Sequence, residues 1–116
     1  MNLNYFKQTR ILDGGMGQEL LARGMKPNGT LWSANALLDK DYHQLLLDTH
    51  RDFVKAGAEV IVTTTFTARR KRLRENNVEE KFEYLNKKAG EIALAVKKEF
   101  PNILVAGGIP PQNLTY

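Results

Sequence analysis

The sequence has no cysteine among its 116 residues. These residues therefore form no disulfide, offer no thiolate nucleophile and build no metal site from cysteine. Long apolar runs are also absent, because none approaches the roughly 18 residues that a membrane helix needs. The first ten residues are polar and lack the apolar core of a signal peptide. These absences predict a cytoplasmic protein that does not enter a membrane.

A large excess of charge of one sign is missing as well. The net charge is +4, with 26% charged and 42% hydrophobic residues, which is ordinary for a folded domain and argues against disorder. Most of the positive excess lies in the run from Arg69 to Arg74. Such a run can bind nucleic acid, but no aromatic residues interleave with it to stack on bases. We therefore expect a solvated helix face and no nucleic-acid partner.

Three short apolar segments are typical of β-strands: 10–13 (RILD), 59–63 (EVIVT) and 103–106 (ILVA). The second and third are rich in valine and isoleucine and do not alternate with polar residues. Continuous apolar runs of this kind favour parallel strands that are covered on both faces.

Helical patterns lie between these segments. Apolar residues recur every three or four positions from Asp41, a candidate cap, to about Ala56, and again from 78 or 79 to 100. Gly57 is expected to end the first of these helices. Shorter helices are expected over 18–23 and 68–75. Strands that alternate with helices predict an α/β fold with parallel strands.

Three parallel strands are too few to close a barrel, which needs eight strands and typically about 250 residues. The third predicted strand would also keep an unpaired edge. We therefore expect residues 1–116 to be the N-terminal part of one larger domain, without an internal boundary. The alternative is a small standalone three-stranded unit that can dimerise.

The first candidate site follows the first predicted strand, in the segment DGGMGQE. Ligands of parallel α/β folds bind beyond the carboxyl ends of the strands. Asp13 is placed to hold a substrate ammonium group, and Gly14 and Gly15 let the backbone approach a ligand. The start of the following helix favours a carboxylate, so the segment suits an amino-acid zwitterion. The alternative is a glycine-rich turn in which Asp13 caps the helix.

The second candidate site, TTTFT, ends the second predicted strand. The hydroxyls of Thr63 and Thr65 can donate to a substrate, and Phe66 can contact an apolar side chain or a sulfur atom. The alternative is that threonines simply favour strands and Phe66 belongs to the core. Trp32 can cover the pocket or pack its own loop, and packing is the favoured interpretation. His50, alone on a helix, is expected to be a packed or surface residue rather than a catalyst.

Four segments in order resemble the homocysteine S-methyltransferase family: ILDGGMGQEL, LWSANALL, THRDFVKAGAEVIVTTTFTA and VAGGIPPQNLTY. The resemblance covers essentially the whole chain. It implies an α/β fold made of the first three βα units of a TIM (β/α)8 barrel, truncated, with parallel strands. It also implies that homocysteine binds at the carboxyl ends of those strands, in contact with Asp13, Gly14, Gly15, Thr63, Thr65 and Phe66.

The activity implied by the resemblance is methyl transfer to the thiol of homocysteine, which gives methionine. Members of the family hold a zinc ion with three cysteine thiolates on late strands. This chain has no cysteine, so the zinc ligands of the complete enzyme are absent from it, and the chain is expected to be an inactive fragment. The alternative is a non-catalytic amino-acid-binding or interaction module of the same fold. The methyl donor is not identified by the sequence, and a homo-oligomer is left open.

Overall fold

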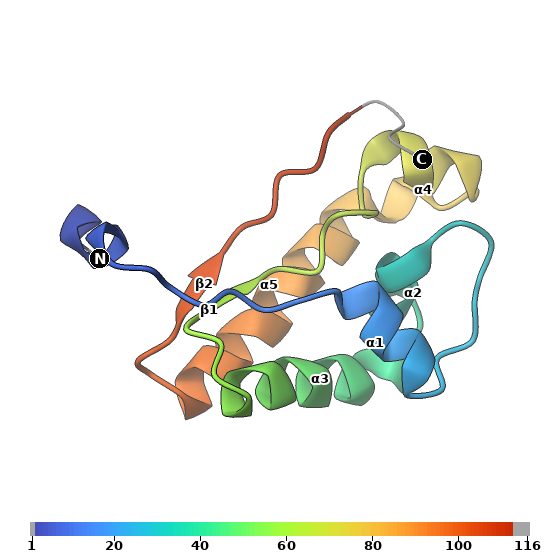
Figure 1. Ribbon diagram of the computed structural model, residues 1–116. Coiled ribbons are helices and arrows are strands. Elements are labelled where there is room, and N and C mark those ends of the chain that lie inside the picture. Colours follow the sequence, from blue (N-terminus) through green and yellow to red (C-terminus); the bar gives the residue numbers. More distant parts are fainter. Residues whose placement is uncertain (1, 113–116) are drawn as a thin grey trace.

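The computed structural model describes residues 2–112, so the last four residues of the segment VAGGIPPQNLTY lie outside the described residues. Within this range the helices and strands alternate as expected (Figure 1). The elements are α1 (Met16–Ala22), α2 (Asn35–Leu38), α3 (His43–Lys55), β1 (Val60–Val62), α4 (Arg70–Glu75), α5 (Phe82–Glu99) and β2 (Leu104–Ala106). Short 3-10 turns cover Leu3–Lys7, Trp32–Ala34, Lys40–Tyr42 and Glu79–Lys81.

The two strands β1 and β2 pair in parallel, with Val60 opposite Leu104. These strands confirm the predictions for 59–63 and 103–106. The predicted strand over 10–13 is wrong in its extent, because the segment makes a single parallel bridge, from Leu12 to Val60. It is hydrogen-bonded along one edge only, and both Ile11 and Leu12 are more than half exposed. The segment has no second neighbouring strand in the described part of the chain, and its apolar side chains are mostly not packed against other residues. Further strand pairing would therefore stabilise it little.

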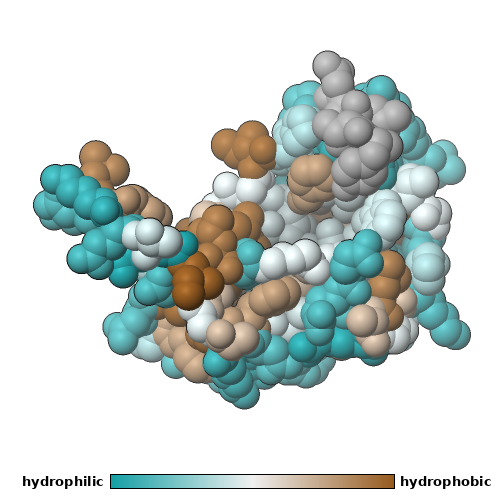
Figure 2. All heavy atoms as spheres, viewed as in Figure 1, coloured by the Kyte–Doolittle hydropathy of each residue, from teal (hydrophilic) through white to brown (hydrophobic). Residues whose placement is uncertain are grey.

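Helices α3 and α5 cover one face of the sheet (Figure 1). Ile61 and Ile103 pack there against Ala93 and Val96 of α5, and Phe53 of α3 packs against the same cluster. These contacts confirm the apolar stripe predicted for the second long helix. No described helix covers the opposite face, and hydrophobic residues gather over the strand region in Figure 2.

A larger apolar cluster joins the helices to the loops that follow the strands. Its fully buried members include one leucine from each of the five α-helices: Leu20, Leu37, Leu46, Leu73 and Leu85. Burying a leucine side chain contributes about 2 kcal/mol, so this cluster holds α1 and the loop around Trp32 firmly beside α3. That arrangement places both next to the carboxyl end of β1.

The ends of α3 follow the expected pattern with one correction. Gly57 has φ +118° and ends the helix as predicted, because glycine adopts this conformation without strain. The predicted cap was wrong by two residues: the carboxylate of Asp39 accepts from the Asp41 N–H at 2.9 Å. The chain enters the helix through the 3-10 turn Lys40–Tyr42, which moves the capping residue toward the N-terminus.

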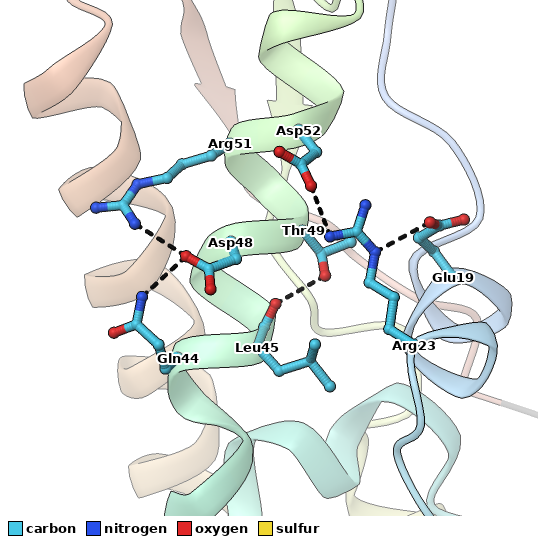
Figure 3. Close-up of polar contacts among 8 residues, drawn as sticks. All are labelled: Glu19, Arg23, Gln44, Leu45, Asp48, Thr49, Arg51 and Asp52. Carbon is cyan, nitrogen blue, oxygen red and sulfur yellow. Dashed lines mark hydrogen bonds and ion pairs between the residues drawn. The ribbon is translucent and has the colours of Figure 1, made fainter.

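Ion pairs connect the helices at their exposed edges (Figure 3). Arg23, which caps the C-terminal end of α1, contacts Asp52 of α3 at 2.7 Å and Glu19 of α1 at 3.0 Å. Arg51 of α3 contacts Glu99 of α5 at 2.6 Å. Exposed pairs contribute roughly 0–1 kcal/mol each, so they orient the helices more than they stabilise them.

The basic run is not the uniformly solvated face that its composition predicted. Arg69 and Arg72 are only 2% and 3% exposed, whereas Arg70, Lys71 and Arg74 are exposed. The guanidinium of Arg72 donates to the Thr30 carbonyl at 2.8 Å. Arg69, which precedes α4, lies over the Phe66 ring instead. The prediction of a solvated face was therefore wrong for Arg69 and Arg72. No helix in the described part of the chain is both long and apolar enough to cross a membrane.

Candidate functional site

A cavity of about 510 Å³ opens at the carboxyl ends of segment 10–13 and β1. It brings together five of the six predicted substrate-binding residues: Asp13, Gly14, Gly15, Thr63 and Phe66. The other lining residues are Met16, Gly17, Gln18, Trp32, Ser33, Val62, Thr64 and Thr67. The acidic end of the first segment and the threonine-rich end of β1 therefore share one cavity. Whether these residues bind a substrate stays a prediction.

Asp13 connects the cavity to the sheet. Its carboxylate oxygen Oδ2 accepts from the Val62 N–H at 3.0 Å, and its own N–H donates to the Val60 carbonyl at 3.1 Å. Burial raises the pKa of the Asp13 carboxyl, while the hydrogen bond from Val62 opposes that rise. The alternative role as a helix cap is wrong, because Gly15 occupies the cap position of α1 and no side chain bonds there. A carboxylate accepts about four hydrogen bonds, so Asp13 retains capacity for a ligand.

Gly14 is required by packing rather than by backbone conformation. A Cβ atom at this position would lie 3.2 Å from Cε1 of Phe53, a side chain that belongs to the cluster below the sheet. A Cβ atom on Gly15 would meet only Gln18, at 3.9 Å. A side chain at position 14 would therefore require the Phe53 ring to shift by a few tenths of an ångström.

Thr63 and Thr65 hold the loop that follows β2. Gly108 donates its N–H to the hydroxyl oxygen of Thr63 at 2.9 Å, and the hydroxyl of Thr65 donates to the Gly108 carbonyl at 2.7 Å. The two hydroxyl oxygens are 3.2 Å apart, so Thr63 donates to Thr65 and closes a ring of three hydrogen bonds. Both hydroxyl hydrogens are thereby used within the protein. Thr65 does not line the cavity.

Thr67 holds the loop that carries Trp32. Its hydroxyl donates to the Leu31 carbonyl at 2.6 Å and accepts from the Ala34 N–H at 3.2 Å. Trp32 between them has φ +50°, a conformation that costs a bulky residue about 1–3 kcal/mol. The favoured interpretation that Trp32 only packs its loop was wrong, because its side chain is 40% exposed and lines the cavity.

His50 lies behind the cavity on α3 and is fully buried, which confirms the expectation of a packed or surface histidine. Its Nε2 is 3.3 Å from the hydroxyl oxygen of Thr64. Burial lowers the pKa of His50 from 6.5 to about 4, so the ring is neutral at pH 7. Thr64, which lines the cavity, was not among the predicted site residues. Strand propensity alone gives no reason to separate it from its neighbours.

The cavity combines a carboxylate and hydroxyls with soft apolar side chains. Met16, Trp32 and Phe66 provide the apolar part, and sulfur–aromatic contacts are favourable. The residues do not fit a zinc site: the sequence has no cysteine, and residues 2–112 contain no group of three or more His, Asp or Glu side chains that could hold a metal ion. The arrangement is suited to binding and orienting a small polar ligand.

Parallel strands with such a cavity at their carboxyl ends define the class of α/β proteins that bind a small ligand at that edge. Residues 10–116 match the family model described as homocysteine S-methyltransferase, and the chain belongs to this family. It is 36% identical to homocysteine S-methyltransferase 2 of Zea mays over 78% of the chain and 26% of that protein. It is 32% identical to homocysteine S-methyltransferase of Escherichia coli over 87% of the chain and 34% of that protein.

The fold agrees with this assignment. The crystal structure of the homocysteine methyltransferase MmuM from Escherichia coli, in its metallated form, superposes with a TM-score of 0.77 at 30% identity. The match covers 93% of this chain and 40% of that one. The chain thus spans between about a quarter and two fifths of the length of these relatives.

Proposed function

We propose that the chain forms part of the pocket in which homocysteine is held for methyl transfer to its thiol. The observation that carries this proposal is the position of Asp13 in the same cavity as Met16 and Phe66. An ammonium group beside Asp13 would compensate for the burial of its carboxylate. The apolar side chains suit the methylene groups and the sulfur atom of the same ligand. The expected product is methionine.

In this proposal the described residues bind and orient the substrate and do not perform the transfer. Zinc coordination would lower the pKa of the homocysteine thiol, which is the chemistry that the family resemblance implies. The described residues do not fit a zinc site, so no step of the reaction is assigned to them. We propose that they are the first three βα units of a (β/α)8 barrel and that the remaining units supply the metal ligands. The uncovered sheet face supports this view, because the inner face of a barrel is filled by side chains from the other strands.

The proposal is tested by binding of L-homocysteine to the 116-residue chain. The sequence has a single tryptophan and it lines the cavity, so Trp32 fluorescence reports ligand entry alongside calorimetry. Asp13→Asn should weaken binding by roughly 10- to 100-fold, as expected when a hydrogen bond between charged groups is lost. Asp41→Asn makes the same change of charge on an exposed residue and should leave binding unchanged. Equal affinities of wild type and Asp13→Asn would contradict the proposed role of Asp13.

A non-catalytic amino-acid-binding module of the same fold is the second candidate, and the missing metal ligands favour it. Both candidates predict that the chain alone binds homocysteine without methylating it, even when zinc is added. They differ in the gene: a reading frame that continues beyond Tyr116 into a cysteine-containing stretch supports the enzyme, and a stop codon there supports the module. A cytoplasmic location stays a prediction for either candidate.

A further inference from the structure

The four threonines around Phe66 do not have the same hydrogen-bonding state. The hydroxyls of Thr63 and Thr65 form the ring with Gly108, and the hydroxyl of Thr67 donates to Leu31. Among these four, Thr64 alone has no backbone partner for its hydroxyl within the described residues. The one hydrogen bond of its side chain within the described residues is with Nε2 of His50, and Thr64 is 95% buried in the wall of the cavity.

The direction of the bond between His50 and Thr64 follows from the other ring nitrogen. Nδ1 of His50 is buried and has no hydrogen-bond partner in the part of the chain that the structure describes. A neutral imidazole carries one N–H and one lone pair. Buried N–H groups without an acceptor are rarer than buried acceptors without a donor. We therefore assign the proton to Nε2, so that His50 donates to the oxygen of Thr64.

This assignment leaves the hydroxyl hydrogen of Thr64, a residue that lines the cavity, without an acceptor among the described residues. A hydroxyl that accepts from His50 donates best to an anionic or strongly polar acceptor. Asp13 lines the same cavity and would repel a ligand carboxylate placed next to it, which keeps the two charged groups of an amino acid apart.

We propose that Thr64 donates a hydrogen bond to the carboxylate of the amino-acid ligand and that His50 is a positioning residue that orients the Thr64 hydroxyl. The inference rests on the proposed function, because it concerns how the same cavity recognises its substrate. In this arrangement Thr63, Thr65 and Thr67 hold loops in place, and Thr64 binds the ligand. Specificity for a ligand that has a carboxylate then depends on the side chains of Thr64, in the loop after β1, and His50 of α3.

The test compares three ligands by calorimetry: L-homocysteine, 4-mercaptobutanoate, which lacks the ammonium group, and 3-aminopropane-1-thiol, which lacks the carboxylate. Thr64→Val should weaken the first two by about 10- to 100-fold, as expected when a hydrogen bond to a charged group is removed. The third ligand should bind equally to both proteins. Thr64→Ser keeps the hydroxyl and should bind all three as the wild type does. A loss common to all three ligands, or to none, overturns the inference.

The tautomer of His50 is measured independently by nitrogen-15 NMR of the imidazole rings. The chain has only two histidines, so His43→Gln assigns the spectrum. A protonated Nε2 is expected, and a protonated Nδ1 overturns the inference without any ligand. His50→Gln, whose amide nitrogen can replace Nε2, should bind all three ligands as the wild type does. His50→Leu should bind L-homocysteine and 4-mercaptobutanoate more weakly and leave the binding of 3-aminopropane-1-thiol unchanged.

The two proposals fail in different ways. If the wild type binds L-homocysteine and Asp13→Asn weakens that binding while Thr64→Val does not, the proposed function stands and the role of Thr64 is wrong. If the wild type binds none of the three thiols, the proposed function and this inference fail together. Should Thr64→Val not fold, Thr64→Ala and the tautomer measurement on the wild type decide the question.

Discussion

The carboxylate of Asp13 accepts the backbone N–H of Val62 at 3.0 Å, which joins the segment before α1 to the end of β1. One side chain thereby aligns two parts of the chain that are 49 residues apart. Because both parts line the cavity, the contact shapes the site as well as the sheet. A residue that serves both purposes can be tested by substitutions that separate them.

Asp13→Ala and Asp13→Asn should differ in stability. Alanine leaves the N–H of Val62 without its acceptor and should lower the free energy of unfolding by about 1–3 kcal/mol. Asparagine keeps an acceptor for the Val62 N–H and removes the negative charge. Burial raises the pKa of the Asp13 carboxyl. A raised pKa means that the folded state holds its proton more tightly than the unfolded state, so the ionised carboxyl opposes folding above that pKa. Asp13→Asn should therefore be at least as stable as the wild type at pH 7 in urea denaturation, and a loss equal to that of alanine would contradict this account.

His50 should make stability depend on pH below neutrality. Its pKa is 6.5 in the unfolded chain and about 4 when buried, so the unfolded state binds a proton first. Stability from the neutral ring is fully present above pH 6.5 and is lost as the pH falls toward 4, by up to about 3 kcal/mol. Urea denaturation between pH 4 and 7 measures this slope. His50→Gln should flatten it, whereas His43→Gln, which retains His50, should not.

Gly108→Ala should break the ring of hydrogen bonds formed with Thr63 and Thr65. An added Cβ would lie 2.9 Å from the Thr65 hydroxyl oxygen and 3.2 Å from Cγ1 of Val62. Overpacking of this kind costs about 1–3 kcal/mol, which thermal unfolding would detect. Gly107→Ala is the matched control, because its Cβ would meet no atom within 4 Å. Equal melting temperatures for the two variants would show that the ring does not hold the loop.

Thr67→Val should loosen the loop around Trp32. The substitution removes the donor to the Leu31 carbonyl, while Ala34 keeps a bond to that same carbonyl. We expect a loss of about 1–2 kcal/mol in stability. The fluorescence of Trp32 should also shift toward that of a solvated indole in the folded protein. Thr67→Ser retains the hydroxyl and should match the wild type in both measurements.

The uncovered face of the sheet should promote self-association. Leu12, which pairs with Val60 of β1, is 56% exposed, and Ile109, in the loop that follows β2, is 92% exposed. Exposed apolar surface of this kind binds hydrophobic dyes and favours aggregation. The double change Leu12→Thr and Ile109→Thr should lower dye binding and the sedimenting fraction. Leu94→Thr removes a similarly exposed leucine from α5 and should have a smaller effect.

Much of the fold was predictable because its signals are local. Apolar periodicity identified α3 and α5, and continuous apolar runs identified β1 and β2. The rule that ligands bind at the carboxyl ends of parallel strands predicted that the acidic and threonine-rich segments form the candidate site. The short helices α4 and α1 were expected within two residues of their observed bounds, since turns and glycines delimit them.

The sequence by itself determined which segments are helical or extended, where the candidate site lies, and that cysteine takes no part in it. Only the tertiary structure decided which side chains are buried and which hydroxyls are already bonded. Arg72 is buried because α4 packs on the loop around Thr30, far away in sequence. The hydroxyl of Thr64 contacts His50 of α3, whereas that of Thr63 bonds with Thr65 and Gly108. Periodicity reflects contacts between residues a few positions apart, whereas these properties arise from contacts between residues that only folding brings together.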